Sequence, residues 1–256
     1  ALLGTEDAHF LAWTTTPWTL PSNTALTVGP KIEYALVKTF NQYTFEPVNI
    51  IAASGLLGKL FGKKFIEGDT ATYEKGTKKI PYEILKTVSG ADLVGIKYEQ
   101  LLDYAQPHER PEDAFRVIPG DFVTTEDGTG IVHTAPTFGA DDAKVAADAG
   151  VPPLLVMDES DNLVPLVDLR GKFRAELADP MFGLGEEYIK VEYLTDEEKE
   201  ASFQEQREKL KPIIPELKAY LSVDERIALK LKLENKAFKI EKYEHSYPHC
   251  WRTDKP

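Results

Sequence analysis

The chain has 256 residues, of which 42% are hydrophobic and 28% are charged, a composition that is ordinary for a globular protein. No apolar run approaches the roughly 18 residues that a membrane span requires, so we expect no membrane partner. The 30 basic and 42 acidic residues give a net charge of −12, which argues against a self-sufficient nucleic-acid binder because phosphate contacts need clustered positive charge.

The first third of the chain predicts β structure interrupted by turns. Residues 10–16 are rich in aromatic and β-branched side chains, and Pro17 then removes a backbone donor. Residues 24–28 and 33–39 predict short strands. Residues 51–61 predict a short helix that ends near a glycine.

The middle of the chain repeats this pattern. Residues 115–118 and 130–134 predict strands, and residues 126–128 between them (Glu-Asp-Gly) indicate a tight turn. A helix is expected over residues 140–149, followed by a buried strand over residues 154–157.

Near the C-terminus the sequence becomes rich in charged residues with a helical pattern. Thr195 followed by Glu198 is a capping-box pattern, which predicts a helix that runs to Leu210. A second helix is expected over residues 224–234. We therefore predict a helical insertion, at about residues 195–224, on a β-rich core.

Residues 13–23 form a threonine-rich segment, Trp-Thr-Thr-Thr-Pro-Trp-Thr-Leu-Pro-Ser-Asn. One interpretation is an edge strand, since threonine suits a half-buried pleated surface. The other is a polar wall, in which the hydroxyls of Thr14, Thr15 and Thr16 point into a cleft and hold a water molecule or an ester carbonyl.

Residues 128–142 form a second segment, Gly-Thr-Gly-Ile-Val-His-Thr-Ala-Pro-Thr-Phe-Gly-Ala-Asp-Asp. An acidic residue at a helix start is stabilising in itself, and a lone histidine at a strand end is more often structural than catalytic. The glycines do not form a phosphate loop, because the Gly-Lys-Ser/Thr and GxGxxG patterns are absent from this segment.

Together these two segments resemble the editing domain of isoleucyl-tRNA synthetase. Residues 245–252 resemble the place where the chain of this family returns to the synthetic body, and the three matches occur in the family's order. The related valyl and leucyl enzymes read Thr-Thr-Arg-Pro, whereas Thr16 stands in the arginine place here. This difference favours the isoleucyl branch.

The resemblance implies one editing domain over residues 1–256, with a return segment at residues 240–256. The implied fold is mixed α/β, with a β-barrel-like core and peripheral helices. The family's HIGH and KMSKS motifs do not occur, so we expect no activation of an amino acid with ATP. The single cysteine, Cys250, favours a reducing compartment, and we expect a cytoplasmic protein.

The implied reaction is hydrolysis of the ester that joins valine to the 3′ end of tRNA(Ile). A pocket cannot strongly reject an amino acid that lacks one methylene, and this valine problem is the standard example of double-sieve editing. The implied partners are the aminoacylated 3′ end of tRNA(Ile), its valine moiety and the synthetic body.

The chemistry of the polar residues in the two segments suggests their roles in this reaction. Thr14 and Thr15 would hold the ester and the attacking water, and Thr16 would complete the wall. Asp142 would bind the ammonium group of the amino acid, leaving the preceding aspartate to cap the helix. His133 would shape the pocket or act as a general base.

Trp13, Asn23 and Thr134 complete the expected site as substrate-binding or supporting residues, together with Thr16. No GxSxG elbow is present. We expect direct attack by water, without a metal or an organic cofactor, since an activated ester needs little covalent help.

Three alternatives stay open at this point. The first is a valyl-type editing domain that clears threonine, the second is a non-catalytic module that binds the tRNA acceptor end, and the third is a generic esterase. A zinc site of His245, His249 and Cys250 is disfavoured, because a closed site needs four ligands and Thr253 stands where the family often has a second cysteine.

Overall fold

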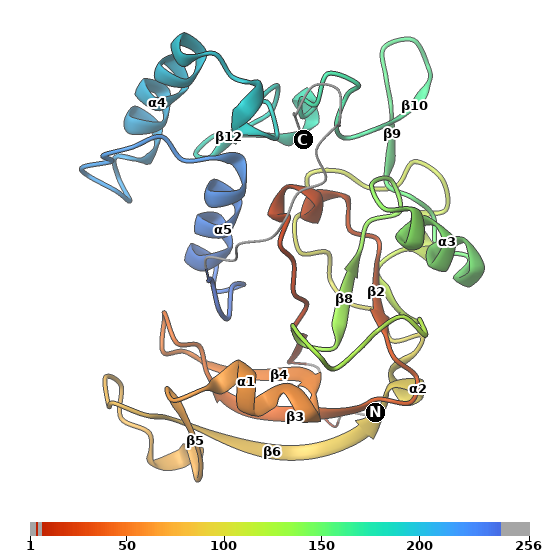
Figure 1. Ribbon diagram of the computed structural model, residues 1–256, viewed down its shortest axis with the longest axis vertical. Helices are drawn as coiled ribbons and strands as arrows, with labels where there is room; N and C mark the ends of the chain where they lie inside the picture. The colour runs from red at the N-terminus through yellow and green to blue at the C-terminus, as the bar shows by residue number, and fades with distance from the viewer. Residues whose placement is uncertain (1–3, 5–6, 242–256) are drawn as a thin grey trace.

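The structure is a computed structural model that describes Gly4 and residues 7–241, and short helices and several separate sheets make up its mixed α/β fold (Figure 1). The strands are β1 (Ala8–Phe10), β2 (Ala25–Val28), β3 (Glu33–Phe40), β4 (Pro47–Ala53), β5 (Phe65–Glu67), β6 (Ile80–Ser89), β7 (Arg116–Pro119), β8 (Ile131–Thr134), β9 (Leu155–Met157), β10 (Leu163–Pro165), β11 (Ala178–Asp179) and β12 (Gly183–Leu184). The α-helices are α1 (Leu57–Phe61), α2 (Gly90–Leu93), α3 (Ala140–Ala149), α4 (Asp196–Leu210) and α5 (Val223–Leu233). The 3-10 helices are η1 (Pro17–Ser22), η2 (Ser54–Leu56), η3 (Thr70–Thr72), η4 (Pro111–Asp113), η5 (Ala175–Leu177) and η6 (Val191–Tyr193).

The larger sheet has five strands in the order β1-β4-β3-β6-β5. Strand β4 pairs with β3 on one side and with β1 on the other, so its last residues are fixed in the ladder. The helix predicted over residues 51–61 is therefore wrong in its first part. Residues 51–53 end β4, and only Leu57–Phe61 form an α-helix, because strand pairing overrides the local sequence signal.

A three-stranded sheet has the order β7-β2-β8, and its central strand β2 is buried at every position, while β9 pairs with β10 and β11 with β12 in two-stranded sheets. Strand β7 lies parallel to β2, whereas β8 lies antiparallel to it. The strands predicted near residues 24–28, 115–118 and 130–134 are confirmed. The turn at residues 126–128 does not join a hairpin, because β7 and β8 both pair with β2.

The β-barrel-like core implied by the resemblance is not confirmed. Within residues 7–241 the sheets stay separate, with β1 and β5 at the edges of the five-stranded sheet and β7 and β8 at the edges of the three-stranded sheet. An isolated bridge between Trp13 and Val132 links the chain after β1 to the edge strand β8. This link brings the threonine-rich segment next to the end of β8.

The predicted helices near residues 140–149, 195–210 and 224–234 are confirmed, with small shifts at their ends. The Thr195 hydroxyl and the Glu198 carboxylate form the expected capping box at α4. The expected capping of α3 by Asp141 is wrong, because Gly139 is its N-cap and has no side-chain cap. No helix in the described part of the chain is long and apolar enough to cross a membrane.

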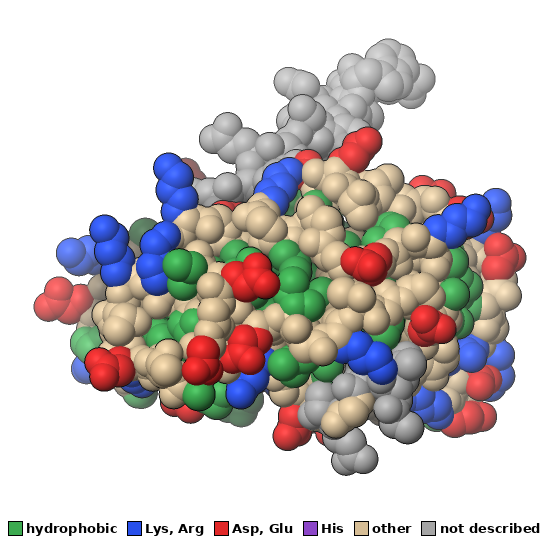
Figure 2. Space-filling view, turned by 90° about the horizontal axis from the view of Figure 1, so that it is seen from below, with side chains coloured by type: hydrophobic (Ala, Val, Ile, Leu, Met, Phe, Trp, Pro, Cys, Tyr) green, Lys and Arg blue, Asp and Glu red, His purple; other side chains and the backbone are tan. Residues whose placement is uncertain are grey.

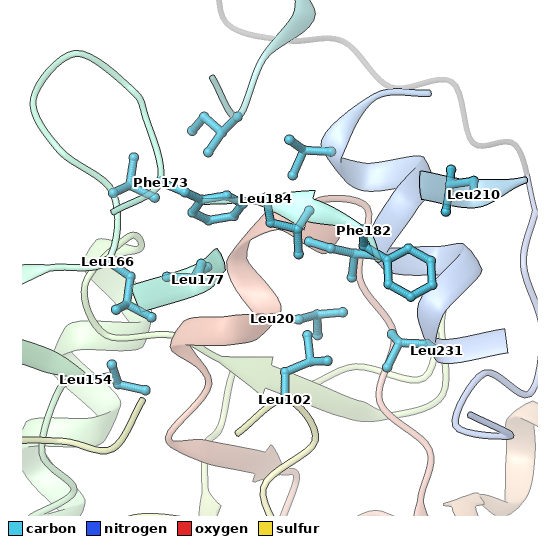
Figure 3. Packing of buried hydrophobic residues seen from close by; sticks show 14 residues of the cluster. Leu20, Leu102, Leu154, Leu166, Phe173, Leu177, Phe182, Leu184, Leu210 and Leu231 are labelled. Atoms are coloured by element: carbon cyan, nitrogen blue, oxygen red, sulfur yellow. The ribbon is translucent and has the colours of Figure 1, made fainter. Parts of the chain in front are cut away.

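The largest apolar cluster joins the helical region to the rest of the protein (Figure 3). Leu20 of η1 shares this cluster with Leu210 at the end of α4 and with Ile227 and Leu231 of α5. The helices near the C-terminus are therefore part of the core around η1, rather than an appendage that stands apart from it.

The surface beneath the larger sheet carries mixed charge. In Figure 2, acidic side chains lie around the exposed apolar groups of this face, several basic side chains gather at one end, and no broad positive surface is visible there. Among the large apolar side chains that are exposed in the described part of the chain are Ile66 of β5 and Ile84 and Leu85 of β6. Phosphate binding gains little from such a face, in keeping with the acidic composition.

Candidate active site

A cavity of about 460 Å³ lies between the threonine-rich segment and the segment that runs from β8 into α3. Its walls come from three stretches of chain, within residues 13–19, 122–133 and 135–142. The polar side chains that line it include those of Thr14, Thr15, Thr16, His133 and Asp142. The fold thus brings the two sequence segments into one site.

The three threonines lie in a turn rather than in a strand. Thr14 Oγ1 accepts a hydrogen bond from the backbone N–H of Thr16 at 3.0 Å and lies 3.5 Å from Thr16 Oγ1. Pro17 then begins η1. All three threonines are half-buried, and the turn keeps them at the cavity wall.

His133, near the end of β8, is buried with both ring nitrogens bonded to side chains. Nδ1 lies 2.8 Å from Asn23 Nδ2, and Nε2 lies 2.9 Å from Thr19 Oγ1. The Tyr98 hydroxyl donates to Asn23 Oδ1 at 2.6 Å, and the Thr19 hydroxyl donates to the Thr16 carbonyl at 2.9 Å.

These partners fix the tautomer of the imidazole. The amide of Asn23 donates to Nδ1, so Nδ1 accepts and the proton lies on Nε2, which donates to Thr19. Burial lowers the pKa of His133 to about 4, so the ring is neutral at physiological pH. Because both nitrogens are engaged, this histidine lacks a free lone pair for a water molecule.

Asp142 lies in the first turn of α3, and its carboxylate reaches back to the preceding loop. Asp142 Oδ2 accepts a hydrogen bond from the backbone N–H of Ala135 at 2.9 Å. Burial raises the pKa of this carboxyl group, and the charge of Asp141 adds to the increase. A cation bound in the cavity would therefore stabilise the ionised form.

Trp13 stands at the rim of the cavity, with 41% of its surface exposed. Its ring lies against Gly128, where a Cβ atom would meet Trp13 Cε3 at 3.1 Å. The φ angle of Gly128 is +73°, a conformation that favours glycine. The first glycine of the Gly-Thr-Gly sequence thus lets the indole ring pack directly against the backbone.

Phe138 forms an apolar part of the wall. Its ring contacts that of Trp18 edge-on, with 4.9 Å between the centroids. Both aromatic rings also pack against the cluster around Leu20. The cavity is therefore bounded on one side by the main core.

Two of the predicted site residues do not line the cavity. Thr134 is fully buried, and its hydroxyl pairs with that of Thr27 at 2.7 Å, across the sheet. Asn23 contacts the site only indirectly, by its hydrogen bond to His133, whose side chain lines the cavity.

Sequence reasoning missed several contributors to the site, among them Thr19, Tyr98 and Phe138. Thr19 and Phe138 fall inside the two motifs, so a systematic reading of every motif position would have found them. Tyr98 has no signal in the sequence, because only the fold brings it to Asn23.

The described residues hold no group of three or more His, Cys, Asp or Glu side chains that could bind a metal ion. The disfavoured zinc site and the return segment from residue 242 onward lie outside the described residues.

No protein-family model matches the chain. The chain is 60% identical to the isoleucine-tRNA ligase of Cytophaga hutchinsonii over 98% of its own length. It is 49% identical to the isoleucine-tRNA ligase of Bacteroides fragilis over 97% of its length. The chain spans 21% of the length of each of these relatives.

Two solved structures show a weaker likeness. The GlLeuRS-CP1 structure has 19% identity and a TM-score of 0.40, over 65% of this chain and 57% of that one. The editing domain of the P. falciparum cytosolic leucyl-tRNA synthetase has 17% identity and a TM-score of 0.41, over 57% of this chain and 47% of that one.

The sequence matches show that the chain is homologous to part of an aminoacyl-tRNA synthetase. More narrowly, it is homologous to a segment of isoleucine-tRNA ligases, which confirms the resemblance predicted from the two motifs. This identification rests on the sequence matches alone.

Proposed function

We propose that this chain is the editing domain of an isoleucyl-tRNA synthetase and that it hydrolyses the ester of mischarged Val-tRNA(Ile). The observation that carries the proposal is a cavity in the described part of the chain that is lined both by the three threonines and by Asp142. Its volume of about 460 Å³ falls within the range of ~300–1,000 Å³ that is usual for small-ligand pockets. The partners are the aminoacylated 3′ end of tRNA(Ile) and the synthetic body, in the cytoplasm.

In this proposal Asp142 recognises the free ammonium group of the aminoacyl ester. Burial and the like charge of Asp141 raise the pKa of this half-buried carboxyl group, because both disfavour its ionised form. An ammonium group in the cavity would supply the positive charge that stabilises the carboxylate. A charge-assisted hydrogen bond of this kind is also stronger than a neutral one. An ester whose amino group is acylated would lose this contact.

The threonines and His133 would then arrange the reaction without a covalent intermediate. Thr14 and Thr15 position the ester carbonyl and a water molecule, and Thr16 closes the wall. His133 shapes the pocket rather than acting as the base, because both of its nitrogens are held by Asn23 and Thr19. Water adds to the ester carbon, the bond to the ribose oxygen breaks, and a proton from the water passes to that oxygen, which releases valine and the free ribose hydroxyl of the tRNA end.

The test compares release of valine, isoleucine and threonine from charged tRNA(Ile) by this chain and by a full-length ligase that contains it. The proposal expects fast release of valine and slow release of isoleucine. Preferential release of threonine would favour a valyl-type editing domain instead. Binding of the acceptor end without any release, in the full-length enzyme as well, would favour a non-catalytic module.

A further inference from the structure

Helix α5 packs directly against η1, although the two helices lie about 200 residues apart in the chain. The apolar part of this contact joins Leu20 of η1 to Ile227 and Leu231 of α5. The polar part is one hydrogen bond, in which the backbone N–H of Trp18 donates to Asp224 Oδ1 at 2.7 Å.

The start of η1 needs such an acceptor. The first N–H groups of a helix have no carbonyl partner within the helix, and a capping side chain usually satisfies one of them. Thr16 is the N-cap of η1 but has no side-chain cap, and Pro17 has no N–H to donate. The N–H of Trp18 is therefore the first donor of η1, and a remote carboxylate accepts it.

Asp224 is well placed for this role because it also belongs to the first turn of α5. Its carboxylate thus lies near the N-terminal ends of two helices, where the backbone dipoles favour negative charge. Ser222 and Glu225 form the capping box of α5, so Asp224 is not needed to cap its own helix.

The charged surroundings of Asp224 are mixed. Burial raises the pKa of its carboxyl group to about 6, and the N–H of Trp18 opposes the increase. Glu225 and Glu192 raise the pKa further, while Lys190 lowers it. The bond to Trp18 is therefore one of the few contacts that favour the ionised carboxylate.

The start of η1 is connected directly to the cavity wall. The Thr16 carbonyl accepts both the backbone N–H of Thr19, at 3.0 Å, and the Thr19 hydroxyl, at 2.9 Å. Thr19 in turn holds Nε2 of His133. A shift at Trp18 would therefore move both the threonine wall and the imidazole.

We propose that Asp224 is a positioning residue of the site, which fixes the start of η1 and thereby the orientation of the threonine wall. The inference rests on the proposed editing function for its kinetic consequence, whereas its structural part stands on the contacts of η1. It also gives the C-terminal helices a role in the site, since α5 supplies the anchor.

The experiment uses a full-length ligase that contains this chain, with the variants Asp224→Ala, Asp224→Asn and Ser222→Ala. Asparagine keeps an oxygen that accepts the N–H of Trp18, so it serves as the conservative rescue. Ser222→Ala removes the cap of α5 but leaves the acceptor of Trp18 in place, so it controls for a general loosening of that helix. Amide hydrogen exchange is followed by mass spectrometry in a peptide that covers residues 17–23, and valine release is measured in parallel.

Asp224→Ala is expected to speed exchange in this peptide and to lower kcat for valine release by about tenfold, with KM changed by less than about threefold. Asp224→Asn should stay close to the wild type in both measurements, and so should Ser222→Ala. Unchanged exchange or unchanged kcat in Asp224→Ala would overturn the inference, as would equal effects in Ser222→Ala. If the wild type releases no valine, the proposed function fails, and the exchange data alone decide whether Asp224 fixes η1.

Discussion

Replacing His133 by glutamine tests the buried hydrogen-bond network most sharply. Glutamine does not titrate, and its amide is long enough to keep a bond toward Thr19. The structure holds the imidazole neutral, with Asn23 donating to one nitrogen and Thr19 accepting from the other. A proton on Nδ1 would displace the donor of Asn23 and leave a buried charge without a partner.

The magnitude follows from the pKa of His133, which burial lowers from 6.5 to about 4. Above pH 6.5 the imidazole is neutral in both the folded and the unfolded chain, and it makes no difference to stability. Between pH 6.5 and 4 only the unfolded chain takes up the proton, so folding is destabilised as the pH falls. The total effect corresponds to roughly 3 kcal/mol, at about 1.4 kcal/mol for each pH unit.

The assay is denaturant unfolding of the wild type and of His133→Gln at a series of pH values from 7.5 to 4. The two proteins have to be compared with each other, because burial raises the pKa of Asp142 and Asp224. Those two carboxyl groups act in the opposite direction, since the stability that they contribute to the folded protein is lost as the pH rises through their folded pKa. Their contribution is common to both proteins and largely cancels in the difference.

The free energy of unfolding of the wild type should fall, relative to that of the variant, by roughly 3 kcal/mol between pH 6.5 and 4. A flat difference over this range would refute the reasoning, because it would mean that His133 takes up its proton in the folded protein at an ordinary pKa. In that case the ring would also be available as a general base.

Two other substitutions test the geometry around the cavity. Gly128→Ala should cost about 1–3 kcal/mol of unfolding free energy, since its φ is +73° and the new Cβ would meet the ring of Trp13 at 3.1 Å. Gly76→Ala is its control, because φ is +93° there but no atom lies within 4 Å, so its smaller loss in a denaturant titration isolates the strain of the backbone. Thr134→Val should cost about 1–2 kcal/mol by removing the bond to Thr27, with kcat for valine release unchanged. A large loss of kcat at unchanged stability would instead place the Thr134 hydroxyl in the reaction.

The sequence predicts the parts of the fold that local chemistry determines. The capping box of Thr195 and Glu198 predicts α4, and the segments predicted as strands at residues 24–28 and 33–39 are β2 and β3. The helix predicted from residue 51 fails because residues 51–53 pair with β3, and Ile51 also pairs with β1, which no local pattern reveals.

The candidate site follows the same division. The two motifs identify the cavity, because Thr14, Thr15, Thr16, His133 and Asp142 all line it. The burial of Thr134 could not be predicted, since it depends on the pairing of β8 with β2. The contacts of Tyr98 and Asp224 join segments that are far apart in the chain, and only the packing of the folded protein brings them together.

The central claim is that the Asp142 carboxylate binds the ammonium group of a valyl ester. Valine release from Val-tRNA(Ile) should be measured for a full-length ligase containing this chain, with Asp142→Asn and, as the matched control, the exposed neighbour in Asp141→Asn. We predict a loss of about 30- to 100-fold in kcat/KM for Asp142→Asn, the equivalent of roughly 2–3 kcal/mol for a charge-assisted bond, and near wild-type release for Asp141→Asn. Equal release by the wild type and Asp142→Asn would contradict the claim.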